Sequence, residues 1–281
     1  MAGCFNLLSV NSIQRRVEYD RRGPAQTGGV VLKWPDDFIN KVICGDCLSV
    51  LPLIPDGAVD AVITDPPYNV DKADWDSIDL APVLYQVGRV MKAGASIYIF
   101  SSLRHLKDLL NIVSPLFEQL NLCIWLFPNG MNRQIDNWQI CYDPVYFGKK
   151  TGQHKFNTDD VRFAYTAGTQ ERIKNPVVKG GKEWKPHADG RKPENVLVVP
   201  CLNHGAGAGE RTEHPTQKPI DLMKMYVSAS SDPNDLILDP FLGSGTTAVA
   251  AKQLGRQFIG IEIEEKYCKI AVDRLRQEEL F

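Results

Sequence analysis

The feature that most constrains the fold is a strand, turn, helix and strand pattern near the carboxyl end of the chain. Residues 236–238 form an apolar run that leads into a turn with two glycines. Residues 248–254 then show an alanine-rich helical pattern, for which Gly255 is a suitable C-cap. Residues 258–263 predict a second strand, which carries Glu262. Strand, glycine turn, helix, strand and acid together predict a nucleotide-binding βαβ unit, and hence an α/β fold.

The turn and the strand ends offer groups that suit a cofactor. Glycines let a ligand approach the backbone closely, and a helix N-terminus favours an anionic group. Glu262 is placed for a bidentate hold on ribose hydroxyls. The turn alone is weak evidence, because only part of the dinucleotide fingerprint is present. The residues predicted to bind a cofactor here are Asp239, Pro240, Phe241, Gly243, Ser244, Gly245, Thr246 and Glu262.

A second stretch, residues 64–69, reads Thr-Asp-Pro-Pro-Tyr-Asn and follows an apolar, β-branched run that predicts a buried strand. The prolines remove two backbone donors and leave the carbonyls of Asp65 and Pro66 free to accept hydrogen bonds from a ligand. Asp65 adds a charged acceptor, and Tyr68 adds a ring for stacking. The stretch therefore suits a planar group with an exocyclic NH2. A tight turn that closes the strand is the alternative, and it explains the prolines but not the acceptor and ring.

Together the two motifs resemble those of the amino DNA methyltransferases, the S-adenosylmethionine (SAM) enzymes that methylate the exocyclic nitrogen of adenine or cytosine. Residues 65–68, Asp-Pro-Pro-Tyr, are similar to the catalytic motif of this family, and residues 239–245 are similar to its cofactor motif. The catalytic motif comes first, which is the order of the β subgroup. Residues 214–219, His-Pro-Thr-Gln-Lys-Pro, match a further family signature. The resemblance covers about residues 41–148 and 211–276.

The resemblance implies a Rossmann-like methyltransferase sheet of about seven strands, circularly permuted in chain order. In this order strands 3 to 7 of the sheet come first, and strands 1 and 2 come last. The ends of the strands at residues 59–65 and 236–239 then lie side by side, so the base and cofactor pockets adjoin. The expected organisation is an N-terminal arm (1–36), a catalytic half (37–148), a target-recognition insertion (149–210) and a cofactor-binding half (211–281).

The resemblance also implies cofactor roles outside the glycine turn. Asp46, with Cys47 beside it, is expected to accept from the adenine amine of SAM; the alternative for Asp46 is an ordinary turn aspartate. Thr216 and Lys218 are expected to meet the methionine end of SAM, although Lys218 by itself would be an unremarkable surface lysine.

The expected chemistry assigns the catalytic role to Asp65, Pro66, Pro67 and Tyr68. A base amine is a poor nucleophile, because its lone pair is delocalised into the ring. Asp65 and the Pro66 carbonyl can accept from its two N–H groups and favour a tetrahedral nitrogen, an interaction that strengthens as positive charge develops. The target base must leave the duplex, and Tyr68 would stack on it.

An aspartate in this motif favours adenine N6 by family habit, and cytosine N4 is the runner-up. A protein or RNA methyltransferase fits less well, because a glutamine or ribosomal-protein enzyme would more typically show Asn-Pro-Pro-Tyr and no basic insertion. A nicotinamide enzyme would need the fuller glycine fingerprint.

The net charge of −2 means that any nucleic-acid contact must be local. Residues 149–210 are locally basic, interleaved with aromatics and rich in loops, which suits contact with phosphates and base edges. DNA contact is also an option for the loop at residues 129–133 and for the basic N-terminal segment. The alternatives to DNA contact are a solvated surface insertion at residues 149–210, a plain hairpin loop at residues 129–133 and a solvated tail at the N-terminus. The residues predicted to bind DNA are Arg133, Lys174, Lys179, Lys182, Lys185 and Arg191.

Partners and location follow from the same considerations. The expected partner is double-stranded DNA, with a homodimer and a cognate restriction endonuclease as further options. No apolar run approaches the ~20 residues of a membrane span, and the N-terminus does not read as a signal peptide. Seven cysteines fit reduced thiols in a cytoplasmic protein of a bacterium, an archaeon or a phage. We expect no metal site, because no second cysteine pair follows Cys44 and Cys47 at zinc spacing.

Overall fold

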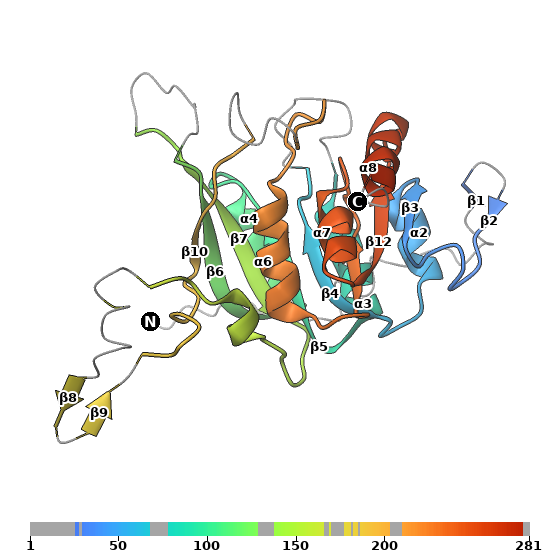
Figure 1. Ribbon diagram of the computed structural model, residues 1–281. Helices are drawn as coiled ribbons and strands as arrows, with labels where there is room; N and C mark the ends of the chain where they lie inside the picture. Colours follow the sequence, from blue (N-terminus) through green and yellow to red (C-terminus); the bar gives the residue numbers. More distant parts are fainter. Residues whose placement is uncertain are drawn as a thin grey trace, which may run out of the picture.

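The structure is a computed structural model, and it shows a mixed sheet with helices on both faces (Figure 1). It describes residues 26–27, 30–67, 78–128, 138–165, 169, 177–180, 182–184, 186–202 and 210–277. Several predicted site residues lie outside this part of the chain, namely Tyr68, Arg133, Lys174 and Lys185. Lys179 and Lys182 are described in their backbone only.

The main sheet has eight strands in the described part of the chain, in the order β10-β6-β7-β5-β4-β11-β12-β3. β7 runs antiparallel to both of its neighbours, and every other neighbouring pair is parallel. The strands are β3 (Lys41–Cys44), β4 (Val59–Thr64), β5 (Met91–Phe100), β6 (Glu118–Leu126), β7 (Tyr142–Lys149), β10 (Val196–Val198), β11 (Leu236–Asp239) and β12 (Gln257–Glu262).

The order of the strands confirms the permuted sheet. β11, late in the chain, lies between β4 and β12, and Ile237 and Leu238 pair with Ala61 and Val62. The polar residues that follow β4 and β11 are therefore brought to one edge of the sheet. The eighth strand is β10, which comes from within residues 149–210 and pairs in parallel with the end of β6.

Two hydrophobic cores lie on the two faces of the sheet, and β5 contributes to both. Ile97 and Ile99 belong to one core, whereas Tyr98 and Phe100 belong to the other, as the twofold alternation of strand side chains requires. The helices that cover the first core are α2 (Cys47–Val50), α3 (Leu80–Val90) and α4 (Leu106–Val113). Those that cover the second are α6 (Ile220–Ser230), α7 (Thr246–Gln253) and α8 (Glu265–Gln277).

Smaller elements complete the described fold. Leu32 and Trp34, at the end of the segment expected to be an arm, pack against the core behind α2 and α3. The hairpin of β8 and β9 stands away from the main sheet, at the lower left of Figure 1. The remaining elements are β1 (Gln26–Thr27), β2 (Val30–Val31), η1 (Leu51–Leu53), η3 (Thr158–Val161), β8 (Val177–Lys179) and β9 (Lys182–Trp184).

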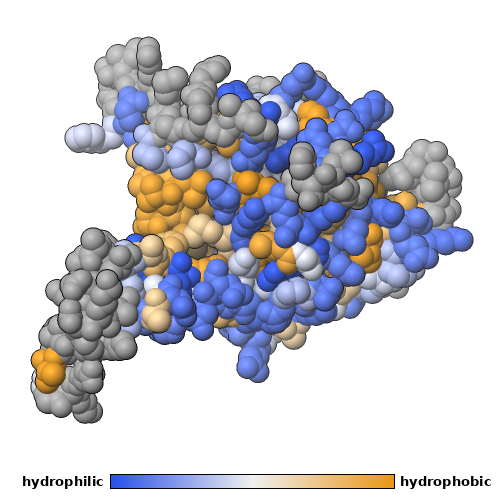
Figure 2. Space-filling view, in the orientation of Figure 1, coloured by the Kyte–Doolittle hydropathy of each residue, from blue (hydrophilic) through white to orange (hydrophobic). Residues whose placement is uncertain are grey.

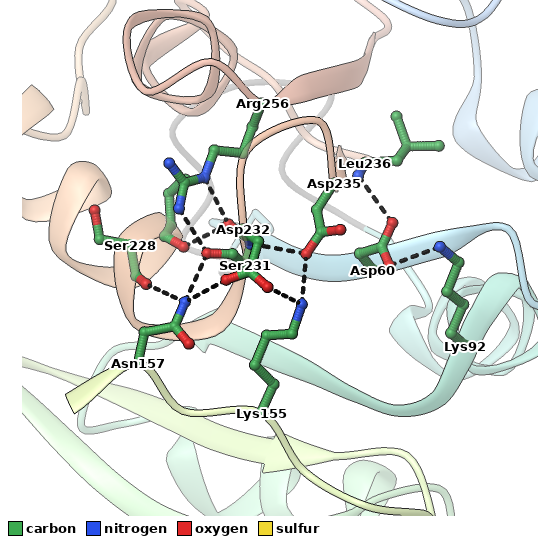
Figure 3. Close-up of polar contacts among 11 residues, drawn as sticks. Asp60, Lys92, Lys155, Asn157, Ser228, Ser231, Asp232, Asp235, Leu236 and Arg256 are labelled. Carbon is green, nitrogen blue, oxygen red and sulfur yellow. Dashed lines mark hydrogen bonds and ion pairs between the residues drawn. The ribbon is translucent and has the colours of Figure 1, made fainter. Parts of the chain in front are cut away.

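Polar contacts at the amino ends of β4 and β11 fix α6 over the sheet (Figure 3). The Asn157 amide donates to the Ser228 carbonyl at 3.2 Å and to the Ser231 carbonyl at 2.9 Å. The Arg256 guanidinium donates to the same Ser231 carbonyl at 2.6 Å. Lys155 forms ion pairs with Asp232 at 2.8 Å and with Asp235 at 2.9 Å. The position of α6 is thus set by Lys155 and Asn157, which follow β7, and by Arg256, which follows α7.

The hydropathy of the surface differs along the sheet. Figure 2 shows apolar surface beside the edge where β10 lies, and Val196 and Val198 of this strand are exposed. No helix in the described part of the chain is long and apolar enough to cross a bilayer.

Candidate active site

A cleft of about 380 Å³ opens at the carboxyl ends of β4, β11, β12 and β3. It brings together residues from stretches that are up to about 220 positions apart in the chain, because parallel strands end at one edge of a sheet. Of the predicted residues, those that line it are Asp46, Cys47, Asp65, Pro66, Pro67, Thr216, Lys218, Asp239, Pro240, Phe241, Gly243, Ser244, Thr246 and Glu262. Gly245 lies behind the lining, where it packs on α8.

The glycine turn between β11 and α7 is held by the carboxylate of Glu262. The Gly243 N–H donates to Glu262 Oε2 at 2.8 Å, and the Glu264 N–H donates to Oε1 at 2.8 Å. A carboxylate has about four lone-pair sites, and the Ile263 N–H is a third backbone donor, so acceptor capacity remains for a ligand. Burial raises the pKa of Glu262, and the backbone donors oppose this rise by stabilising the carboxylate.

Gly245 occupies a position that only glycine fits well. Its φ is +86°, and a Cβ at this residue would lie 2.8 Å from the Ala271 Cβ of α8. The turn can therefore approach α8 closely only because this residue has no side chain.

Replacing Gly245 with alanine should combine backbone strain with a steric clash. We expect Gly245→Ala to lower the free energy of unfolding by about 2–4 kcal/mol, from left-handed strain and overpacking together. The matched control is Gly57→Ala, because Gly57 has φ +64° with nothing within 4 Å of its Cβ position. It should cost only about 1 kcal/mol. Urea denaturation of both variants measures the difference, and equal losses would contradict the close approach to α8.

Asp239, at the end of β11, connects the two halves of the site. Its Oδ1 accepts from the Thr64 hydroxyl at 2.9 Å and from the Phe241 N–H at 3.1 Å. Asp239 is only 4% exposed, and burial raises its pKa to about 7. Thr64 lies in the stretch identified from the sequence, where it was given no role, and it ties the end of β4 to the end of β11.

Asp65 forms an ion pair with Lys218, which precedes α6. The Lys218 side chain is 7% exposed and that of Asp65 is 18% exposed. The Lys218 Nζ lies 5.2 Å from the ring centroid of Phe100 and 5.9 Å from that of Trp125, within the range of cation–π attraction. The sequence predicted Lys218 for the cofactor, and the structure places its ammonium on the predicted catalytic carboxylate.

His214 packs against the glycine turn, although the sequence singled it out only as part of a signature. Its ring lies 4.3 Å from that of Tyr267, centroid to centroid, and its Nδ1 accepts from the Thr216 N–H at 3.3 Å. A Cβ at Gly243 would lie 2.9 Å from His214 Nε2. Burial lowers the pKa of His214 to about 4, so the ring is neutral at pH 7.

Arg274 of α8 was also missed from the sequence. Its guanidinium donates to the Ser244 carbonyl at 2.8 Å and to Thr246 Oγ1 at 2.9 Å. The same group lies 3.6 Å from Glu210, whose carboxylate accepts from the Ile220 N–H at 2.8 Å. Arg274 thereby joins the glycine turn to the segment that carries Lys218.

Asp46 caps α2 at the end of β3, where it accepts from the Leu48 N–H at 3.0 Å and from the Ser49 hydroxyl at 3.2 Å. Its carboxylate lines the cleft while it makes these contacts. Burial raises the pKa of the neighbouring Cys47 thiol to about 12, so this cysteine stays protonated and contributes packing.

Arg191 is the one predicted DNA-binding residue whose side chain is described. Its guanidinium pairs with Glu194 and lies 5.1 Å from the ring centroid of Phe163. In the backbone register of β8 and β9, Lys179 pairs with Lys182.

The sequence matches the family of N6 and N4 DNA methylases over residues 59–273, a span that includes both motifs of the cleft. The chain belongs to this DNA methylase family. The DNA methylase is 34% identical to the Type II methyltransferase M1.MboII of Moraxella bovis, over 86% of this chain and 98% of that protein. It is 32% identical to the DNA adenine methyltransferase YhdJ of Escherichia coli K12, over 83% of this chain and 82% of that protein.

Solved structures agree with this membership. The DNA methylase superposes on a complex of M1.HpyAVI with SAM at a TM-score of 0.56 and 27% identity, covering 83% of this chain and 98% of that one. It superposes on the cytosine-N4-specific PvuII DNA methyltransferase at a TM-score of 0.61 and 18% identity, covering 83% and 85%. The second likeness shows a shared fold.

Proposed function

We propose that this DNA methylase transfers a methyl group from SAM to the N6 nitrogen of a flipped-out adenine in double-stranded DNA. The observation that carries the proposal is the position of Asp65. This carboxylate stands at the end of β4, partly buried, in the same cleft as the glycine turn and Glu262. An acceptor for an amine and a cradle for a nucleoside cofactor thus share one space.

SAM is the cofactor of this enzyme family, and the residues of the cleft fit it. Gly243 has φ +55° and donates to Glu262, so the turn exposes backbone to a ligand and keeps an acid beside it for the ribose hydroxyls. Asp46, at the end of β3, offers an acceptor for the adenine amine. When bound, SAM supplies the electrophilic methyl group.

The residues of the chain supply the activation of the target amine. Asp65 and the Pro66 carbonyl accept from its two N–H groups and draw electron density back onto nitrogen. Both interactions strengthen as positive charge develops on that nitrogen, which is the condition for catalysis rather than binding alone. Asp65 need not be a strong base, because the proton can leave after the transfer. Tyr68 is assigned the stacking of the flipped base, and it lies outside the described residues.

Two considerations support adenine over cytosine. The motif carries an aspartate at residue 65, and the relative from Escherichia coli is named as an adenine methyltransferase. The acceptors for the amine would serve N4 of cytosine equally, so cytosine is the outcome that the test must distinguish.

Product analysis tests the proposal directly. The protein is incubated with SAM and unmethylated DNA, the DNA is digested to nucleosides, and the methylated nucleoside is identified by mass. N6-methyladenine is the expected product. N4-methylcytosine would keep the mechanism and overturn the base assignment, and the absence of a methylated base would overturn the proposed function.

Loss of the Glu262 carboxylate should act on the cofactor and not on DNA. We expect Glu262→Ala to weaken SAM binding by about 10- to 100-fold, the range for hydrogen bonds to a charged group, and to change DNA affinity without cofactor by less than about twofold. Calorimetry for SAM and fluorescence anisotropy for DNA measure the two effects. Glu265→Gln is the matched control, because Glu265 is exposed on α8. Equal losses of SAM and DNA binding would contradict the ribose role.

A further inference from the structure

The carboxylate that is assigned to the target amine already holds an amine. Lys218 donates to Asp65 Oδ2, and this pair lies inside the cleft, with both side chains mostly buried. A side-chain ammonium offers three N–H donors, and the amino group of a base offers two. Lys218 therefore presents to Asp65 the same kind of donor that the substrate would bring.

Asp65 cannot accept from both the Lys218 ammonium and the base amine in the reacting state without a cost in free energy. Positive charge develops on the target nitrogen during methyl transfer, and a second cation on the same carboxylate would oppose it. The surroundings of Lys218 offer the ammonium another place. Its Nζ lies 3.5 Å from the Thr216 carbonyl and faces the rings of Phe100 and Trp125. The unbranched lysine stem can move the charge toward these groups without moving α6.

We propose that Lys218 is a positioning residue that occupies the amine-accepting carboxylate of Asp65 until the target base enters, so that the base amine displaces the ammonium before methyl transfer. This inference rests on the proposed function of Asp65 as acceptor for the target amine.

Displacement has a consequence for the product. A methylated amine retains only one N–H, so it can no longer donate to both Asp65 and the Pro66 carbonyl. The returning Lys218 ammonium then competes more effectively, and it favours release of the methylated base. Lys218 thus weakens the binding of the substrate base somewhat and in return prevents the product from remaining in the site.

A double-mutant cycle between Lys218 and the base amine tests the proposal. The methylated site is first mapped, and duplexes are made with the target base or with the same base lacking its exocyclic amine, purine for adenine or 2-pyrimidinone for cytosine. Affinities of the protein for both duplexes are measured without cofactor. The ratio of these affinities reports what the amine contributes. We expect Lys218→Met to raise this ratio about tenfold or more, because the amine no longer has to displace a charged donor.

Three further variants serve as controls. Lys218→Arg retains a cation and should keep a ratio close to that of the wild type. Lys218→Gln replaces Lys218→Met if the latter does not fold, as judged by circular dichroism. Lys224→Met, on α6 itself, should leave the ratio unchanged.

The outcomes separate the two proposals. An unchanged or smaller ratio in Lys218→Met, with a wild-type enzyme that methylates DNA, overturns the role of Lys218 and leaves the proposed function intact. A wild-type enzyme that methylates no DNA base overturns the proposed function itself. If the product is N4-methylcytosine, the pyrimidinone duplex still tests Lys218. Slower product release in Lys218→Met, seen as a burst of methylation followed by a lower steady rate, would support the role of Lys218 in releasing the methylated base.

Discussion

Asp65→Asn is expected to lower kcat for DNA methylation by about 10²–10³-fold, the range for loss of one preorganised electrostatic contact to a transition state. The asparagine keeps the size of the side chain and one acceptor oxygen. It loses the negative charge, whose interaction with the amine strengthens as that nitrogen becomes positive. The effect should therefore fall on kcat rather than on KM.

The measurement is single-turnover methylation of a mapped site, with SAM affinity determined in parallel by calorimetry. SAM affinity should change by less than about threefold, because Asp65 is assigned to the base and not to the cofactor. The control is Asp189→Asn, whose side chain is 75% exposed. Retention of full methyl transfer by Asp65→Asn would refute the mechanism. Retention of cofactor-dependent DNA binding without methylation would show that binding and chemistry separate at this residue.

The elements that build the site follow local sequence rules, which is why the sequence predicted them. The apolar runs before Asp65 and Asp239 became β4 and β11, both almost fully buried. The glycine turn was predicted from its two glycines between a strand and a helix, and Gly243 and Gly245 both have a positive φ, which favours glycine. The family motifs then fixed the order of the strands, and the pairing of β11 with β4 confirmed it.

The contacts that tune the site could not be predicted in this way, because they join residues that are far apart in the chain. Lys218 and Asp65 are separated by 153 positions, and Thr64 and Asp239 by 175. The Lys218 contact depends on how α6 packs on the sheet, and the Arg274 contacts depend on how α8 packs, and no local pattern reports that packing. The contact between Lys218 and Asp65 was consequently not predicted, and Arg274 was missed.

The edge of the sheet shows the same limit. β10 has only three residues, and two of them are exposed, so its apolar signal is weak. Its pairing with β6 is a tertiary event that adds a strand to the seven that were expected. The basic region around it was interpreted from charge, which says where phosphate contacts are favourable but not which backbone segments join the sheet.

The free energy of unfolding of the wild-type protein is expected to fall as pH rises, because of Asp239. In Asp239→Asn this fall should be absent. Burial raises the pKa of Asp239 from 3.8 to about 7, so between these values the folded state binds a proton that the unfolded state does not. The free energy of unfolding then falls with rising pH across this window and levels off above about pH 7. Asparagine cannot ionise, so the difference between variant and wild type should grow from near zero at pH 4 to a value on the order of 4 kcal/mol at pH 8.

Asparagine can also keep the contacts that hold Asp239 in place. Its carbonyl can accept from Thr64 and the Phe241 N–H as Oδ1 does now, and its NH2 can donate to the hydroxyl of Thr247. Urea unfolding at constant ionic strength between pH 4 and pH 8 measures the difference, with exposed Asp160→Asn as the control variant. If Asp239→Asn were less stable than the wild type by the same amount at every pH, the charge of Asp239 would be accommodated in the fold without penalty. In that event the link between the ends of β4 and β11 would depend on an ionised carboxylate, and not on a protonated one.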